Sequence, residues 1–439
     1  MRQPDGTTVI RVWLAEHPFP DYLATPRKLA AGFERAHPGY RIEVTGHDFR
    51  ELPARVAEAA AAGRPPDIAE YYYTATQLAR DMRAPDGRPL FTSVEAAAGG
   101  RTAILGEPVV LSDIIPAARD YYSYEDLAAV PATITTTLLF VNLTLLREAG
   151  IAPVPSTWSE LEDACAALAG CPGGPPHGIT WPNHGWLFQQ AVAEQGGLLA
   201  DHANGRRGRA ATVDLTSPEL MRYVAWWQRL HAKGHYLHAG DPWDWSACLD
   251  AFFEQRVAFT FNSSVVADLL VQEGASAGFE VGVYPMPRQG GVPYAGHLVS
   301  GQALWLTGGL DEVRRDGALA FLQYLLNPRN AAEWHRASGF LPATRAAAEL
   351  LATEGWFDAK PHHRVALDQL AASDRSTAAL GALLGGFAGI QQEMTDAMDD
   401  VLLRGATPGP RFAEATRRAQ RMLDEYNADP GGSRDFTVA

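Results

Sequence analysis

The chain has 439 residues, of which 46% are hydrophobic and 20% are charged, and its formal net charge is −14. This composition is that of a globular protein with two large lobes or about three smaller domains. The acidic balance argues against nucleic acid and anionic membrane surfaces as partners. No apolar run approaches the roughly 18 residues that span a bilayer.

The start of the chain and its cysteines leave the compartment open. The first residues, MRQPDGTTVIRVW, lack the apolar stretch of a signal peptide, which fits a cytoplasmic protein or an exported one after removal of its signal. Cys165, Cys171 and Cys248 show no CxxC spacing. They are either three buried thiols or, outside the cytoplasm, one disulfide and one free thiol.

The first 75 residues alternate predicted strands with predicted helices. Two Pro residues precede a third strand within RPPDIAEYYY. This alternation is typical of an open α/β sheet, which binds ligands at the carboxyl ends of its strands. The other predicted strands span 7–14 and 40–47, and the predicted helices span 22–37 and 50–63.

Later segments predict a second lobe. Residues 132–142, ATITTTLLFVN, form a β-branched run with no breaker, which predicts a long strand passing between two lobes. A helix-rich block follows, and then FEVGVYPMP and HLVSGQALWLTGG are β-rich again before a helical remainder. We therefore expect discontinuous lobes around a ligand cleft. The expected division is 1–131 plus 281–325 for lobe 1 and 132–280 plus 326–439 for lobe 2.

Residues 330–347, NAAEWHRASGFLPATRAA, predict a tight elbow between two helices. Asn330 stands three residues before Glu333, as in a capping box, and Gly339 is a helix stop signal. The elbow presents Phe340. Such an elbow either packs in the core or contacts a ligand.

Four tryptophans lie in polar, loop-like segments. An indole face can stack on the C–H face of a sugar ring or hold a quaternary ammonium, and neighbouring Asp, Asn and His can bind hydroxyls. The alternative for each is a place in the core. These candidates are Trp181 and Trp186 in TWPNHGW, and Trp243 and Trp245 in GDPWDWSA.

Glu70 and Tyr71 come at the end of a predicted strand, where an α/β sheet binds its ligand. Tyr72 and Tyr73 follow them. Because strand residues alternate between faces, these tyrosines are equally compatible with a half-buried core.

Motifs for catalysis and metal binding are absent from the sequence. It contains no GxSxG, GxxxxGK[ST], GxGxxG or HExxH, so we expect no catalytic residues and no cofactor. His231, His235 and His238 include an i,i+4 pair, but no further ligand completes a zinc set at a recognised spacing. We expect no metal. A glycosidase needs only two carboxylates, so a carbohydrate-active enzyme stays open as an alternative.

Several segments resemble, in order, family 1 extracellular solute-binding proteins of ABC importers. They include PPDIAEYYYTAT, LLFVNLTLLREAGI, PSTWSELEDACAAL, FEQRVAFTFNSS, VSGQALWLTGG and FLQYLLNPRNAAEWH. The elbow is similar to the AAEWHxxTGYLPxT segment of that family, and the closest subgroup binds glycerol-3-phosphate and glycerophosphodiesters. The resemblance implies a periplasmic-binding-protein type II fold, with two discontinuous α/β lobes joined by a hinge that the chain crosses several times.

In that subgroup a Tyr, a Glu, two Ser, a Gly, a second Tyr and an Arg hold the ligand. Only Ser263 and Gly301 are identical here, and Asn262 precedes that Ser. The Arg position falls on Gln391, which has no charge for a phosphate but can both donate to and accept from a sugar hydroxyl. The remaining positions fall on Phe49, on Tyr71 beside Glu70, and on Thr135 and Phe340.

The resemblance therefore implies a receptor that binds a neutral sugar of galactose or glucose type and delivers it to the permease subunits of an ABC importer. A glycerophosphodiester such as glycerophosphocholine, or glycerol-3-phosphate, is the alternative ligand. The receptor is expected to be a monomer, in the periplasm or at the cell surface. The Ala, Gly and Arg bias suggests an actinobacterial host, which tethers such receptors as lipoproteins.

Overall fold

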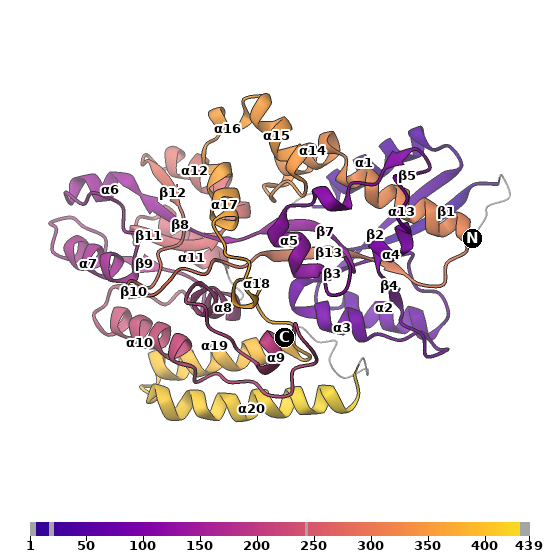
Figure 1. Cartoon of the computed structure of the whole chain (residues 1–439). Helices are drawn as coiled ribbons and strands as arrows, with labels where there is room; N and C mark the ends of the chain where they lie inside the picture. The colour runs from indigo at the N-terminus through magenta and orange to yellow at the C-terminus, as the bar shows by residue number, and fades with distance from the viewer. Residues whose placement is uncertain (1–5, 17–21, 242–244, 431–439) are drawn as a thin grey trace.

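The computed structural model describes residues 6–16, 22–241 and 245–430. It shows two α/β lobes side by side, each built around its own sheet, with helices on the outside (Figure 1). Each sheet takes strands from distant parts of the chain. This is the two-lobed fold that the sequence predicts.

The first sheet is mixed, in the order β2-β1-β3-β13-β4, and β7 also pairs with β13. β1 runs parallel to β2 and β3, as expected for the alternating start of the chain, whereas β13 is antiparallel to β3. Buried aliphatic side chains such as Ile10, Val12 and Ile68 fill its core. The strands are β1 (Thr8–Glu16), β2 (Tyr40–Asp48), β3 (Ile68–Tyr72), β4 (Phe91–Thr92), β7 (Val130–Thr135) and β13 (Ser300–Thr307).

The second sheet has the order β10-β9-β11-β8-β12. β8 lies between β11 and β12 and is antiparallel to both, and all six of its residues are buried. Its strands are β8 (Thr137–Asn142), β9 (Ile179–Thr180), β10 (Tyr236–Leu237), β11 (Phe259–Ser263) and β12 (Val281–Tyr284). A separate two-stranded hairpin pairs β5 (Ala103–Ile104) with β6 (Glu107–Pro108).

The predicted strand over 132–142 does pass between the lobes. β7 ends at Thr135 in the first sheet and β8 begins at Thr137 in the second, so Thr136 alone joins them. The chain returns to the first sheet between β12 and β13. The chain therefore crosses between the sheets more than once, and the ends of β7, β11 and β13 meet at the junction.

The helices surround these sheets. In the amino-terminal part they are α1 (Ala24–Ala36), α2 (Leu52–Ala61), α3 (Thr76–Asp81), α4 (Val94–Ala98) and α5 (Pro116–Tyr122). The middle part contains α6 (Leu143–Glu148), α7 (Trp158–Ala169), α8 (Gly185–Glu194), α9 (Asp201–Asn204), α10 (Pro218–Ala232), α11 (Trp245–Phe253) and α12 (Ala267–Ser276). The last part contains α13 (Glu312–Leu326), α14 (Pro328–Ser338), α15 (Arg345–Thr353), α16 (Trp356–Ala359), α17 (His362–Ala371), α18 (Thr377–Leu380), α19 (Phe387–Leu403) and α20 (Pro408–Ala428).

Two segments differ from the expected lobe boundaries. β12 belongs to the second sheet, although residue 281 was expected to begin the return to lobe 1. α14 packs on α1 and α13, beside the first sheet, although residues from 326 onward were expected in lobe 2. Both differences have one cause, because strand pairing and helix packing decide membership in a lobe and neither is visible in local composition.

The elbow is present, but its first helix is capped differently from the prediction. α14 begins at Pro328, and the Asn327 side chain accepts a hydrogen bond from the backbone N–H of Arg329. The cap expected at Asn330 is therefore wrong, because that residue lies inside the helix. Gly339 ends the helix with φ of 77°, as predicted, and Phe340 follows directly.

Within the described ranges, no helix is long and apolar enough to cross a membrane. The three cysteines are free thiols in the structure, with Cys165 and Cys248 buried and Cys171 half-buried.

Candidate functional site

A pocket of about 520 Å³ lies where the two sheets meet. This volume falls within the range of small-molecule binding sites. Eight predicted site residues line it: Phe49, Thr135, Trp186, Trp245, Asn262, Ser263, Gly301 and Phe340. The rest of its lining is Arg50, Tyr72, His184, Ser246, Leu249, Val265, Val266, Ser300 and Gln302.

The floor of the pocket is polar and is built from strand ends of both sheets. Thr135 ends β7 of the first sheet and Ser263 ends β11 of the second, and their hydroxyl oxygens are 2.6 Å apart. Ser300 begins β13 and donates to the Tyr72 hydroxyl across 3.3 Å. A ligand on this floor would contact both lobes, which is the arrangement that couples binding to closure.

Aromatic rings form the walls. Trp186 is the second residue of α8 and Trp245 is the first residue of α11, and their ring centroids are 6.1 Å apart. Phe340 extends from the elbow, and Phe49 follows β2 of the first sheet. The sequence predicted all four as site residues and left Tyr72 open between the ligand and the core. Tyr72 is in the lining, on the same face of β3 as Glu70, because strand side chains alternate.

Two hydrogen-bond donors in the lining have no partner in the structure. They are the Nδ2 of Asn262 and the indole Nε1 of Trp186, and both side chains are buried. A buried donor without a partner costs about 1–3 kcal/mol, so native proteins rarely keep one. Because both atoms lie in the lining, they are able to donate to oxygen atoms of a ligand in the pocket.

The lining carries little charge. Burial lowers the pKa of His184 to about 4, so its imidazole is neutral at pH 7. Among the described residues, Arg50 is the one charged side chain of the lining, and it is exposed, with its guanidinium 5.1 Å from the centroid of the Phe49 ring.

Two predicted aromatic residues belong to the core instead of the pocket. Trp181 is fully buried and stacks on Trp226 and Phe261 in the second lobe, so its predicted role at the ligand is wrong. Tyr71 points to the face of β3 opposite Tyr72, where its ring packs edge-on against Phe91. The positions of both side chains depend on packing partners that are not their neighbours in the sequence.

Two predicted polar residues are also outside the lining. The Gln391 amide donates to the Tyr73 hydroxyl across 2.9 Å, so it links α19 to the residue after β3, and it lies outside the pocket lining. The Glu70 carboxylate accepts from the Ala15 N–H at 2.7 Å and from the Tyr22 hydroxyl at 3.4 Å. Trp243 lies outside the described residues.

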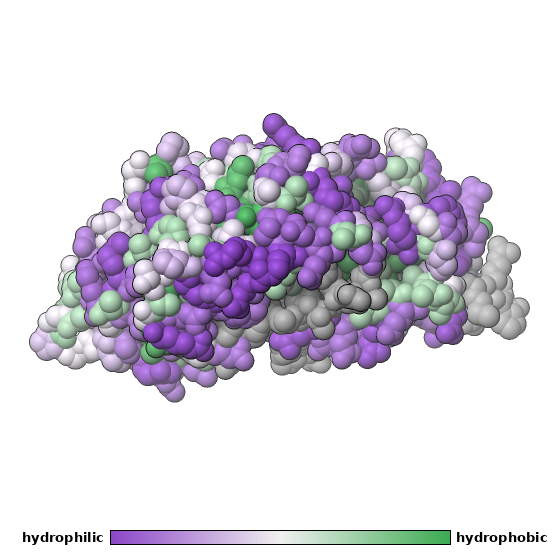
Figure 2. Space-filling view, turned by 90° about the horizontal axis from the view of Figure 1, so that it is seen from below, coloured by the Kyte–Doolittle hydropathy of each residue, from purple (hydrophilic) through white to green (hydrophobic). Residues whose placement is uncertain are grey.

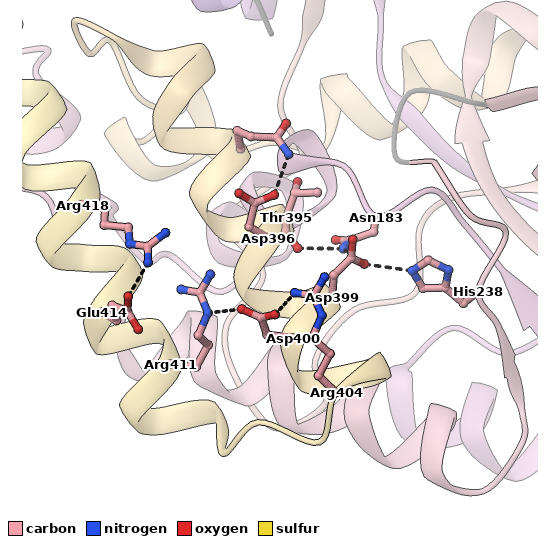
Figure 3. Close-up of polar contacts among 11 residues, drawn as sticks. Asn183, His238, Thr395, Asp396, Asp399, Asp400, Arg404, Arg411, Glu414 and Arg418 are labelled. Atoms are coloured by element: carbon pink, nitrogen blue, oxygen red, sulfur yellow. Dashed lines mark hydrogen bonds and ion pairs between the residues drawn. The ribbon is translucent and has the colours of Figure 1, made fainter.

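One carboxylate on α19 contacts a residue shortly before each tryptophan of the aromatic wall. Asp399 accepts from the Asn183 amide at 2.7 Å, just before His184 and Trp186 in the chain. The same oxygen contacts the Nε2 of His238 at 2.9 Å, on the segment that leads towards Trp245 (Figure 3). Asp399 thus ties together the two segments that carry the wall.

A buried carboxylate, that of Asp81, joins the lobes beyond the pocket. It ends α3 and accepts from Arg209 and, at 2.9 Å, from the Tyr426 hydroxyl of α20. Burial would raise the pKa of Asp81, but the hydrogen bonds from Arg209, Gln77 and Tyr426 hold it below its usual range. The lobes therefore contact one another through polar side chains beyond the pocket as well as around it.

Glu70→Gln is expected to change how stability depends on pH. Burial raises the pKa of Glu70 to about 7, so the folded protein holds this proton more tightly than the unfolded chain does. The wild-type protein therefore loses stability as pH rises from 4 to 8, by roughly 3 kcal/mol from this group. Denaturant unfolding should show Glu70→Gln gaining that much relative to wild type over this range.

Glu160→Gln provides the control. Hydrogen bonds from the Ser156 backbone and side chain hold the pKa of Glu160 low, so its carboxylate contributes stability that is present at neutral and alkaline pH and is lost in acid. Glu160→Gln should therefore be less stable than wild type at neutral and alkaline pH, and this difference should disappear as pH falls, which is the opposite trend to that of Glu70→Gln. A stability difference between wild type and Glu70→Gln that stays constant from pH 4 to 8 would contradict the burial of an ionisable Glu70.

Two lobes around one pocket, with strand ends of both lobes in its floor, define a binding protein that closes on a small ligand. The chain matches the profile of bacterial extracellular solute-binding proteins over residues 28–365. It is 26% identical, over 407 residues, to the sn-glycerol-3-phosphate-binding periplasmic protein UgpB of Escherichia coli, with 91% of this chain and 89% of the relative covered.

Solved structures show the same fold. The cyclic alpha-maltosyl-1,6-maltose binding protein of Arthrobacter globiformis matches with a TM-score of 0.77 at 17% identity, over 96% of this chain and all (100%) of that one. UgpB of Mycobacterium tuberculosis, in complex with glycerophosphocholine, matches with a TM-score of 0.72 at 22% identity, also over 96% and 100%.

The chain belongs to the bacterial extracellular solute-binding protein family. It is an extracellular or periplasmic solute receptor of an ABC importer, and not an enzyme. Its task is to bind a small ligand and deliver it to the membrane permease.

Proposed function

We propose that the receptor binds a neutral sugar, a mono- or small oligosaccharide of galactose or glucose type, in the interlobe pocket. The observation that supports this most is the pair of buried, unpaired donors, Asn262 Nδ2 and Trp186 Nε1, among aromatic rings. Sugar hydroxyls supply acceptors for such donors, and indole faces stack on sugar C–H faces.

The charges of the lining favour a neutral ligand over a phosphate. A phosphate in a desolvated site requires cations or several backbone donors. The lining instead offers hydroxyls and amides from Thr135, Ser263 and Gln302, and a neutral His184. The support for a neutral ligand therefore comes from the residues that line the pocket, and not from Gln391, which lies outside it.

A glycerophosphodiester or glycerol-3-phosphate is the second candidate. Arg50 is a specific reason to keep it, because its guanidinium is at the pocket and can bind a phosphate in bidentate fashion. The E. coli relative is named for glycerol-3-phosphate binding. Trp186 and Trp245 could hold a choline group by cation–π attraction.

Thermal unfolding with single ligands tests the sugar proposal. Galactose, glucose, maltose, trehalose, glycerol-3-phosphate and glycerophosphocholine are added separately at millimolar concentration. A ligand present at 100 times its Kd stabilises the native state by about 2.7 kcal/mol, which raises Tm by several degrees. The proposal predicts this rise with a sugar, and recovery of that sugar chemically unchanged. A rise with the phosphates alone would refute the sugar, and turnover of the sugar would refute the receptor.

Asp399→Ala is expected to weaken binding of that sugar about tenfold without unfolding the protein. The variant removes the acceptor shared by Asn183 and His238, so the segments that hold Trp186 and Trp245 lose their common anchor. A tenfold loss corresponds to about 1.4 kcal/mol, the size of one or two hydrogen bonds. Calorimetry measures it, and Asp399→Asn, which keeps the acceptor, should restore most of the affinity.

Asp400→Ala is the matched control for this anchor. Asp400 is the next residue on α19, but it accepts from Arg404 and, at 2.6 Å, from Arg411, away from the wall segments (Figure 3). It should bind the sugar as wild type does. Equal affinity of Asp399→Ala and Asp400→Ala would show that the anchor does not position the wall.

We also propose that the receptor acts as a monomer. The face seen in Figure 2 is mostly hydrophilic, with its apolar residues scattered. The large apolar side chains that are exposed in the described structure come from separate elements: Leu105, Tyr124, Leu198, Leu269, Val313 and Leu403. A stable dimer needs a contiguous apolar patch, so this scatter supports a single copy.

A further inference from the structure

We propose a divalent cation site, of the type that binds Zn²⁺, formed by Asp268, His362 and His363 outside the sugar pocket. The Asp is the second residue of α12, and the two His residues begin α17. One ligand atom from each residue lies within 4.8 Å of the other two, and within the described part of the chain no other His, Cys, Asp and Glu side chains form such a group.

The distances fit a tetrahedral ion. Zn²⁺ binds imidazole nitrogen and carboxylate oxygen at about 2.0–2.2 Å, which places tetrahedral ligand atoms roughly 3.4 Å apart. The Oδ1 of Asp268 lies 2.7 Å from the Nε2 of His362 and 3.2 Å from the Nε2 of His363. Small rotations of these side chains would admit the ion and leave a fourth position for water or a further ligand.

His363 supplies an independent observation. Its side chain is only 3% exposed, and its Nε2 makes no hydrogen bond although it faces the carboxylate. A buried nitrogen in that state is rare. A metal ion between this nitrogen and the Asp268 Oδ1, which is 3.2 Å away, would give both atoms a partner.

Lys360 shapes the site. Its ammonium donates to the Oδ2 of Asp268 across 2.6 Å and leaves Oδ1 to face the imidazoles. The carboxylate of Asp268 thus accepts from Lys360 through one oxygen and contacts His362 through the other. A metal-ligating carboxylate often has such an outer hydrogen bond. The same positive charge opposes the ion, so it limits the affinity.

Calorimetric titration of the full chain with ZnCl₂, at pH 7.5 and without sugar, tests the site. We expect one cation per chain with micromolar or tighter Kd. His362→Gln, His363→Gln and Asp268→Asn should each weaken it at least tenfold, and Co²⁺ should give the intense visible bands of a tetrahedral ion. Lys360→Met should tighten Zn²⁺ binding several-fold because it removes the opposing charge. In a simple ion-pair cluster, Lys360→Met would produce no such gain.

His231→Gln is the control, since His231 lies on α10 outside the cluster and should leave Zn²⁺ affinity unchanged. Thermal unfolding without metal checks each variant. If His363→Gln does not fold, His362→Gln decides, because that side chain is more exposed (13%). Absence of Zn²⁺ binding by wild type, or equal affinity in wild type and His362→Gln, would overturn the site. Neither result depends on which solute fills the interlobe pocket.

Discussion

Gly301→Ala is expected to destabilise the protein by about 4 kcal/mol, which is exceptional for the addition of one methyl group. Gly301 has φ of 122°, a conformation that residues with a Cβ rarely adopt. A Cβ at this position would overlap the carbonyl oxygen of Thr133 on β7. Because that atom is backbone, relief requires the β7–β13 pairing to shift, and the pairing holds the pocket floor.

Gly291→Ala separates backbone strain from the overlap. Gly291 also has a positive φ, of 82°, but a Cβ there would meet nothing within 4 Å. This control should cost only about 1–2 kcal/mol. Denaturant unfolding measures both variants. If Gly301→Ala is no less stable than Gly291→Ala, the close approach of β7 to β13 is not as the structure has it.

Trp245→Ala is expected to weaken binding of the sugar at least 30-fold, or about 2 kcal/mol. Its half-buried ring faces Trp186 and His184, whose ring centroids are 6.1 Å and 5.5 Å away. Truncation removes a stacking surface and admits water to the wall. Phe340→Ala should also weaken binding. Calorimetry provides the Kd, and circular dichroism should show both variants folded.

Trp245→Phe and Trp13→Ala are the controls. Trp245→Phe keeps an aromatic face and should recover much of the affinity. Trp13 is a half-buried indole on β1, outside the pocket lining, so Trp13→Ala should bind as wild type does even if it is less stable. If Trp245→Ala and Phe340→Ala both keep wild-type affinity, the pocket described here does not hold the ligand.

The order of elements could be predicted from sequence because local signals determine it. Alternation in β1 and β2, the helix between them, and the run of residues 132–142 all correspond to elements of the structure. The pairing of β12 with β8 could not be predicted, since strands separated by more than a hundred residues must meet in three dimensions.

The site residues could be predicted where they stand next to a helix start or a helix stop that the sequence itself signals. Phe340 follows a Gly stop, and Trp186 and Trp245 stand in the first turns of their helices. The prediction was wrong where residues distant in the sequence bury the side chain. Trp181 has the same local setting as Trp186, but only the tertiary structure shows it stacked on Trp226.

The prediction that Gln391 contacts the ligand also failed. Its hydrogen-bond partner, Tyr73, is 318 residues away in the chain, so the resemblance to a family position could not show this contact. The proposed cation site was missed for the same reason. Asp268 and His362 are 94 residues apart, whereas the histidines with a local metal-like spacing are His231, His235 and His238. In the structure His238 contacts Asp399.

Calorimetric titration of the wild-type chain tests most directly whether the interlobe pocket is a neutral-sugar site. The titrants are galactose, glucose, maltose, trehalose, glycerol-3-phosphate and glycerophosphocholine, each in the same buffer. The structure predicts one site with micromolar or tighter Kd for a sugar and no heat from either phosphate compound. Tight binding of glycerophosphocholine with every sugar silent would contradict it, and would mean that Arg50 and the tryptophan wall recognise a phosphodiester.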